Sequence, residues 1–162
     1  MKSVMLSIQP KWCELIANGK KAIEVRKTRP KLETPFKCYI YETKSANDVH
    51  GFSILGRYRL GKVIGEFVCD SIRKGRADNL VQAYYHNNPS ETCLTDQELA
   101  LYANDGQPLY FWHISDLKIY DNPKELGEFK QKVKKCTNGV YYSVKKPLTH
   151  PPQSWYYVEK LL

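Results

Sequence analysis

Seven short runs of apolar or alternating residues, most of them separated by turn signals and not by regular helices, constrain the fold of this chain most. Runs of this length and pattern are typical of β-strands, whereas strands that alternate with helices would predict a doubly wound sheet. The sequence therefore predicts an α+β fold with a mixed β-barrel and two or three short flanking helices. The predicted strands are 4–8, 21–27, 36–41, 62–73, 109–114, 117–120 and 155–158.

Two segments begin with helix-start signals. Pro10 suits the first position of a helix, and apolar residues then recur at three- and four-residue spacing as far as Ile16. We predict a short amphipathic helix there, which ends at Asn18-Gly19. The order Thr-Asp-Gln-Glu at 95–98 matches a capping box, so we predict a second helix that continues to residue 103.

The segments between these elements are predicted as follows. Residues 43–60 form a loop or a hairpin, and the polar and aromatic residues 77–88 are a third helix candidate. Gly65 lies inside a long predicted strand, which indicates a β-bulge. Asp-Asn-Pro at 121–123 predicts a turn. The chain has 162 residues and no long linker, which suits one domain with a core that needs no metal or disulfide.

The composition excludes several classes of protein. No run approaches 18 apolar residues, and the first apolar stretch is too short for a signal peptide. The five cysteines are odd in number and lie at least 24 positions apart, which favours free thiols over disulfides or a zinc site. We expect a cytoplasmic protein with no metal, no other cofactor and no membrane partner. These cysteines are Cys13, Cys38, Cys69, Cys93 and Cys136.

The net charge of +8 is unevenly distributed along the chain. Residues 1–31 hold eight Lys and Arg against two acids, and residues 124–146 hold seven against two. Residues 85–122 hold one Lys against six acids. Two basic segments that fold together would attract a polyanion, and the 12 Tyr and 3 Trp suit a surface that meets nucleic acid. The alternative is two unrelated solvated faces, with the aromatic residues in a β-rich core.

The densest chemical signal is the segment Gly-Lys-Lys-Ala-Ile-Glu-Val-Arg at 19–26. Glu24 and Arg26 share one face of the predicted strand, and Lys21 lies at the corner before it. Glu24 can accept a hydrogen bond from an exocyclic amine, and Arg26 can bind a phosphate or a base edge through two bonds. Cationic neighbours can lower the pKa of Lys21 towards that of a useful base. The alternative is an exposed salt bridge, worth under about 1 kcal/mol.

The segment 7–27 resembles the opening motif of the ASCH domain family, whose fold is a PUA-like β-barrel. Gly-Lys-Val-Ile-Gly-Glu-Phe at 61–67 is similar to a later strand of that barrel, and a looser resemblance extends over 109–120. The tail at 151–156 resembles a bacterial and phage-type branch. The residues that carry the match to the opening motif are Gln9, Pro10, Trp12, Leu15, Ile16, Gly19, Lys21, Glu24 and Arg26.

This resemblance implies a domain organisation and a site. It implies a single PUA-like domain over 1–162, with a core at about 3–120 and a C-terminal extension at 121–162 that closes the barrel. It also implies that RNA or a modified nucleoside binds in a cleft beside the opening motif. Small bacterial members of the family hydrolyse N4-acetylcytidine, and others are reported to act as ribonucleases.

The family's amidohydrolases imply three catalytic positions. They use a Lys at the position of Lys21, a Thr nucleophile three residues later, and a Glu shortly before the following helix. Here Glu24 replaces the Thr, and Glu91 is the match for the last Glu. The hydroxyl nucleophile is therefore missing. A carboxylate that acted as general base on water would be a different mechanism.

Further residues have both a structural and a functional interpretation. Trp12 is either a core residue of its helix or a platform on which a base stacks. His113 is either a structural strand residue or a titrating group at the cleft. Gln153 and Ser154 form either a polar turn or a pair that contacts a base edge and a phosphate. Gln9 belongs to the opening motif and is a candidate ligand-binding residue.

Two other patterns are better explained by structure. Glu98 has the spacing of a capping residue, and a Cys13–His113 thiol–imidazole pair would lack a third, orienting residue. Three functions remain. The first is a binding module for RNA or a nucleoside in a basic cleft. The second is an amidohydrolase of acylated cytidine, or a ribonuclease, with Lys21 as the activated base. The third is an accessory protein that binds another protein or forms a homodimer.

Overall fold

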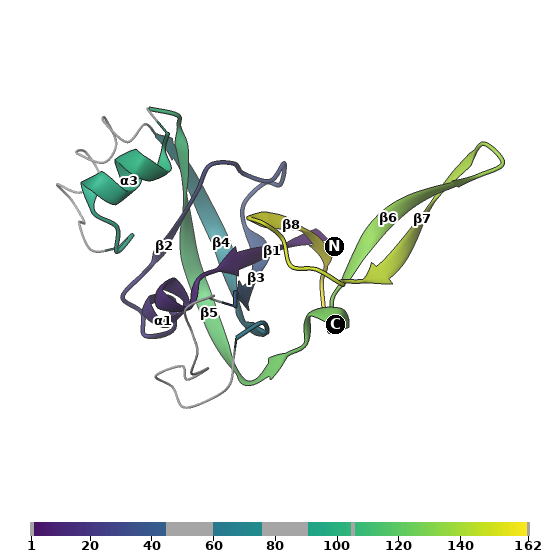
Figure 1. Ribbon diagram of the computed structural model, residues 1–162, viewed down its shortest axis with the longest axis horizontal. Helices are drawn as coiled ribbons and strands as arrows, with labels where there is room; N and C mark the ends of the chain where they lie inside the picture. The colour runs from purple at the N-terminus through teal and green to yellow at the C-terminus, as the bar shows by residue number, and fades with distance from the viewer. Residues whose placement is uncertain (1, 45–59, 76–90, 105, 162) are drawn as a thin grey trace.

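The computed structural model describes residues 2–44, 60–75, 91–104 and 106–161 (Figure 1). The predictions for 43–60 and 77–88 lie largely or wholly outside these residues. No helix among the described residues is long and apolar enough to span a membrane. The elements are β1 (Lys2–Ile8), α1 (Pro10–Ala17), β2 (Ile23–Arg26), β3 (Phe36–Glu42), β4 (Val63–Gly75), α3 (Asp96–Tyr102), β5 (Leu109–Lys124), the 3₁₀ turn η1 (Leu126–Glu128), β6 (Lys130–Thr137), β7 (Val140–Pro147) and β8 (Trp155–Glu159).

In the described part of the chain, six strands form one mixed sheet in the order β2-β5-β4-β3-β1-β8. The β1–β3 pair is parallel and the other pairs are antiparallel. Side chains connect the two edges of this sheet. The Trp155 Nε1 donates to the Thr28 Oγ1 at 2.9 Å, and the Lys31 amide donates to the Tyr157 hydroxyl at 2.7 Å. The predicted mixed, barrel-like β fold with short helices is thus confirmed, although side chains and not a strand ladder bridge the edges of the described sheet.

The long strand β5 corrects one prediction. The segments 109–114 and 117–120 were predicted as two strands before a turn at 121–123, but all of them belong to one strand of 16 residues. Asp116, with φ of 46°, lies where the pairing with β4 shifts by one residue, so a bulge joins the two segments. The predicted bulge at Gly65 is confirmed by a second register shift, and a side chain there would meet the Lys118 carbonyl.

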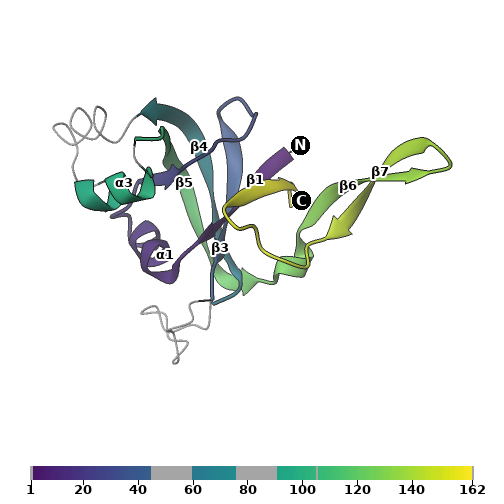
Figure 2. The ribbon, with the colours of Figure 1, turned by 45° about the horizontal axis from the view of Figure 1, so that its top comes forward.

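The helices form where local signals predicted them. Pro10 begins α1, and the reciprocal bonds of Thr95 and Glu98 begin α3. Alternation along β1 explains how the sheet is buried on both sides. Val4 and Leu6 face the main core shared with α1, whereas Met5 faces a second cluster beside η1. Helices α1 and α3 lie at the end of the molecule opposite the β6–β7 hairpin (Figures 1 and 2).

The hairpin formed by β6 and β7 was not predicted from the sequence. Asn138 and Gly139 connect its strands, and both have positive φ values, 51° and 77°. An Asn-Gly pair in this conformation is typical of the two-residue turns that connect twisted antiparallel strands. The signal was therefore present in the sequence, within the segment that was described only by its positive charge.

Candidate functional site

A cleft of about 680 Å³ lies between α1, β2, α3 and the segment that enters β8. It brings together seven of the nine residues that the sequence singled out as site candidates. These are Gln9, Trp12, Lys21, Glu24, Arg26, Gln153 and Ser154. Gln153 and Ser154 lie more than 120 positions from the other five in the sequence, so only the folded chain places them at the same cleft.

Strand β2 positions the charged residues of the cleft. Its alternation directs Ile23 and Val25 into a cluster with Leu99 of α3 and Phe111 of β5. Glu24 pairs with Trp112 across the ladder and lies on the opposite face. The sequence predicted a half-buried strand with a charged second face, but all four residues of β2 are buried. The charged face is covered because it points into the barrel-like interior and not into solvent.

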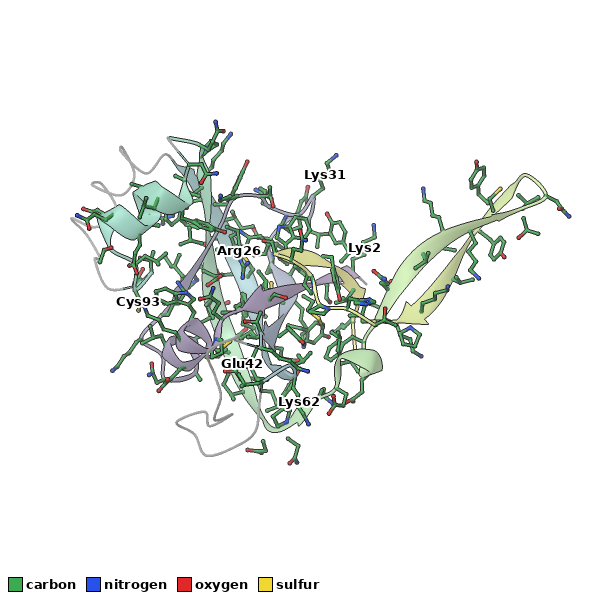
Figure 3. The ribbon with its side chains drawn as sticks, in the orientation of Figure 1. Lys2, Arg26, Lys31, Glu42, Lys62 and Cys93 are labelled. Carbon is green, nitrogen blue, oxygen red and sulfur yellow. The ribbon has the colours of Figure 1, made fainter. Side chains whose placement is uncertain are left out.

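Arg26 connects the two edges of the sheet. Its Nη2 lies 2.9 Å from the Glu24 Oε1 and donates to the Ser7 carbonyl at 2.8 Å. Its Nη1 donates to the carbonyl and hydroxyl of Ser154, at 3.4 and 3.3 Å. Figure 3 places Arg26 between β2 and β8. The Arg26 Nε is buried and has no hydrogen-bond partner within the described structure.

Lys21 is a buried amine, only 3% exposed. Its Nζ donates to the Thr92 carbonyl at 2.6 Å and lies 3.6 Å from the Glu24 Oε2. Burial lowers the pKa of Lys21 from its usual 10.5, and the charge of Glu24 opposes that change. The sequence attributed a lowered pKa to cationic neighbours, but desolvation is the larger cause and Arg26 is a minor one.

Glu24 connects Lys21 to Arg26, because one carboxylate oxygen faces each cation. We call these three residues the charged triad. Each side chain is at least nine-tenths buried, so the triad is not the exposed salt bridge that was the structural alternative. Glu98 is the fourth charged residue among the described lining residues, which therefore hold two cations and two anions. The charges of these residues balance.

Other lining residues add aromatic and aliphatic surface to the cleft. Trp12 packs partly against the main core, and its ring also lies 5.2 Å from the Lys21 Nζ and 4.3 Å from the Lys11 Nζ. Trp12 therefore packs against the core, which confirms its structural role, and its ring also lines the cleft. The opposite wall comes from α3 and the residues before it. It consists of Leu94, Glu98, Leu101 and Tyr102.

Sequence reasoning missed most of this second wall. It assigned Glu98 to the capping box, which the structure confirms, yet Glu98 also lines the cleft. The available signal was the spacing of 98, 101 and 102, which places three residues on one face of the predicted helix, with Leu94 just before its N-cap. Leu101 is 79% exposed, so this face of α3 is only partly packed.

Two candidate residues lie outside the lining. The His113 Nδ1 is 2.7 Å from the Asp70 Oδ1 in an exposed pair on β5 and β4. Glu91 contributes its carbonyl, which accepts from the amides of Ala22 and Ile23 at 2.9 Å. This backbone contact holds the segment before α3 against β2. The buried Cys13 thiol donates to the Ile8 carbonyl, whereas the His113 ring pairs with Asp70.

The cleft offers few ligands to a metal ion. No group of three or more His, Cys, Asp or Glu residues in the described ranges is arranged to hold one. All five cysteines are free thiols. The described lining supplies hydrogen-bond donors and acceptors, aromatic faces, two carboxylates and one buried amine.

The comparisons with known proteins agree with this architecture. The ASCH protein of Zymomonas mobilis superposes with a TM-score of 0.66 at 19% identity, over 98% of this chain and 88% of that chain. A Tyr-to-Phe mutant of that protein gives 0.67 at 19% identity, over 99% and 92%, and a Ser-to-Ala mutant gives 0.66 at 19%, over 98% and 89%. At this identity the likeness shows the fold.

Sequence comparison identifies the family. A search of curated proteins gives no significant match. The profile of the ASCH domain matches residues 6–139, which include the opening motif and extend past the 120 expected from the resemblance. Because the match spans most of the chain and the fold agrees with it, this protein belongs to the ASCH domain family.

Proposed function

We propose that the cleft binds one nucleotide of a single-stranded RNA, or a modified nucleoside, with the base inside and the sugar–phosphate backbone towards solvent. The observation that supports this best is the buried charged triad in a cleft of about 680 Å³ with an aromatic wall. Ligand sites of about 300–1,000 Å³ typically combine apolar walls with a few convergent polar groups. Membership of a PUA-like family supports RNA as the source of the base.

The charge balance of the lining supports a base and not a phosphate as the buried part. Two cations and two anions leave no net positive charge to neutralise a phosphate inside. A nucleobase is neutral, presents donors and acceptors at its edge, and stacks on aromatic rings for about 1–3 kcal/mol. Gln9, Gln153 and the carboxylate of Glu24 supply the complementary polar atoms.

Calorimetric titration with nucleosides and with RNA of about 4 nucleotides tests this proposal. We expect Trp12→Ala to weaken binding by about 1–3 kcal/mol, because a stacking face is lost. Glu24→Gln keeps the shape of the side chain and should also weaken binding. Leu15→Ala is the matched control, since it shortens a side chain on the same helix outside the lining. Equal binding by all four proteins, or no binding to any of these ligands, would refute the proposal.

Hydrolysis is the second candidate function, and the buried amine of Lys21 favours it. A lysine whose pKa is lowered by burial can act as a general base, and Glu24 lies 3.6 Å from it. In an amidohydrolase reaction, the base accepts a proton from water as the water oxygen attacks the acyl carbon of an N4-acylated cytidine. The carbon–nitrogen bond then breaks, and the released amine takes up a proton.

Turnover assays distinguish this function from binding. The wild-type protein and Lys21→Ala are compared on N4-acetylcytidine and on a short single-stranded RNA, with circular dichroism to show that both are folded. Deacetylation that depends on Lys21 would establish an amidohydrolase in which Glu24 replaces the family's Thr. RNA cleavage that depends on Lys21 would establish a ribonuclease. Binding without turnover of either substrate would leave a reader of RNA or nucleosides.

A further inference from the structure

The β6–β7 hairpin projects from the body of the molecule on a fixed base (Figures 1 and 2). Phe129 and Leu148 lie directly before β6 and after β7, and both are buried. The Leu148 amide donates to the Phe129 carbonyl at 2.9 Å, and the Phe129 ring packs edge-on against Tyr39 at 4.9 Å. With eight residues in each strand, the ribbon is about 27 Å long. It is a projecting element with an anchored base.

The hairpin carries uncompensated positive charge. Residues 129–158 contain six lysines and no Asp or Glu. Ladder partners share a face of a two-stranded ribbon, so Lys130, Lys132, Lys134 and Lys145 lie on one face. Lys135 and Lys146 lie on the other face. Figure 3 shows side chains standing out from both faces of the ribbon.

Among the described residues, acidic partners are found only at the base of the hairpin. Lys132 and Lys145 are directly opposite each other, an arrangement that destabilises a β-ladder. Glu159 of β8 relieves this repulsion, because its carboxylate oxygens lie 3.7 Å from the Lys132 Nζ and 3.3 Å from the Lys145 Nζ. The other four lysines form no ion pair with a described residue. They are Lys130, Lys134, Lys135 and Lys146.

Aromatic side chains accompany these lysines at the tip. Tyr141 is 78% exposed and Tyr142 is 44% exposed, one on each face of the ribbon. Val140 beside them is 66% exposed. A protein surface that combines cationic side chains with unpacked aromatic rings suits single-stranded nucleic acid, since phosphates attract the charges and bases stack on the rings. An acidic peptide would leave the rings without a planar partner.

The chain itself connects the hairpin to the cleft. Pro147 ends β7, and Ser154 lines the cleft seven residues later, so the base of the hairpin lies at most about 25 Å from the cleft along the backbone. We propose that the hairpin binds the sugar–phosphate backbone of the RNA strand whose base occupies the cleft. This inference rests on the proposed function and adds a second, electrostatic contact to it. The hairpin thereby selects a strand of RNA over a free nucleoside.

Fluorescence anisotropy with single-stranded RNA of about 4 and about 20 nucleotides tests this inference, from about 50 to 200 mM salt. The hairpin variant replaces Lys130, Lys134, Lys135 and Lys146 with Gln. The matched control replaces four exposed lysines of the body with Gln, namely Lys31, Lys44, Lys74 and Lys118. Both variants lose the same net charge, and none of the eight side chains is buried.

We expect the hairpin variant to bind the long RNA at least tenfold more weakly. Its slope of log affinity against log salt should be smaller by up to about 3, since each single-strand phosphate contact contributes about 0.7. Affinity for the short RNA, which the cleft alone can hold, should stay within about twofold, and the body control should retain most of the long-RNA affinity. Tyr141→Ala should lower long-RNA affinity about fivefold or more.

The outcomes separate this inference from the proposed function. Equal affinity and salt slope in the hairpin variant and the body control would overturn the inference and leave the cleft proposal standing. Short-RNA binding lost in Trp12→Ala, together with hairpin-dependent binding of the long RNA, supports both. Hairpin-dependent binding of the long RNA without any short-RNA binding would support RNA binding by the hairpin and refute base binding in the cleft. A polyglutamate peptide that bound the hairpin as tightly as the long RNA would overturn RNA as the partner.

Discussion

The cleft and the hairpin both depend on lysine and arginine side chains, but they hold these charges in opposite ways. In the cleft, Lys21 and Arg26 are buried and share one carboxylate, Glu24. On the hairpin, four lysines are exposed and lack an acidic partner in the described structure. Positively charged side chains are therefore buried and paired in the cleft but exposed and without an acidic partner among the described residues on most of the hairpin, and these two arrangements suit different physical roles.

This difference concerns the distance over which each charge acts. Buried pairs are screened little by salt, and removing one partner leaves an uncompensated charge in a medium of low dielectric. The charged triad can thus fix the shape of the cleft and discriminate among ligands at contact distance. Exposed charges contribute little to stability but attract a polyanion from farther away. The hairpin can thus raise the rate and strength of association without defining which base is bound.

The largest expected effect is on stability, when the cleft loses its arginine. Arg26→Ala should lower the free energy of unfolding by about 3–5 kcal/mol, because it leaves Glu24 buried with Lys21 alone and removes the guanidinium's hydrogen bonds to Ser7 and Ser154. Lys134→Ala on the hairpin should change it by less than about 0.5 kcal/mol. Urea unfolding measures both values. Similar losses of unfolding free energy in the two variants would show that buried and exposed cations contribute equally to stability, against this comparison.

A substitution at the hairpin turn should destabilise the hairpin and leave the cleft unaffected. Gly139 has φ of 77°, a left-handed conformation that costs a residue with a side chain about 1–2 kcal/mol. Gly139→Ala should speed hydrogen exchange of β6 and β7 amides and leave nucleoside binding in the cleft unchanged. Gly127→Ala in η1 is the control, because the added Cβ would lie 3.9 Å from the Leu148 carbonyl oxygen, an ordinary van der Waals contact. Faster exchange throughout the main sheet would contradict an independent hairpin.

The pH dependence of stability should report the burial of Lys21. Because burial lowers its pKa below 10.5, the folded protein releases this proton at a lower pH than the unfolded chain does. Between the two pKa values the unfolded chain binds more protons, so the free energy of unfolding should rise with pH in that window. The rise should be smaller in Lys21→Met, as measured by urea unfolding at a series of alkaline pH values. Identical slopes in both proteins would indicate that Lys21 is solvated.

The smallest expected effect concerns the base of the hairpin. Burial raises the pKa of Glu159, but the hydrogen bond with Lys145 and the charges of Lys132 and Lys145 together lower it by more. The pKa of Glu159 therefore lies below its usual 4.5. A lowered carboxyl pKa stabilises the fold above 4.5, and this contribution is lost as the pH falls through the lowered value. Amides of β6 and β7 should therefore exchange faster in Glu159→Gln than in wild type at neutral pH. The two proteins should converge in acid, and a constant difference would contradict the role of this charge.

The sequence predicted the local elements well because their signals are local. Pro10 and the capping box of Thr95 and Glu98 place helix starts through contacts within one turn. It divided β5 into two strands because Asp116 and Asn122-Pro123 resemble turn signals. Pairing with the long strand β4 overrides those signals, since the bulge at Asp116 keeps the ladder continuous.

The sequence by itself determined which charges share a face, because alternation along β2 places Glu24 beside Arg26 in any sheet. It also determined the hairpin turn, since Asn138-Gly139 suits two positive φ angles. Only the tertiary structure decided that the charged face is buried, that α3 supplies the second wall, and that Ser154 meets Arg26 across 128 positions. The physical reason is that burial and long-range hydrogen bonds depend on how the two edges of the sheet approach each other. That approach is a property of the whole packed sheet and is not encoded in any one segment.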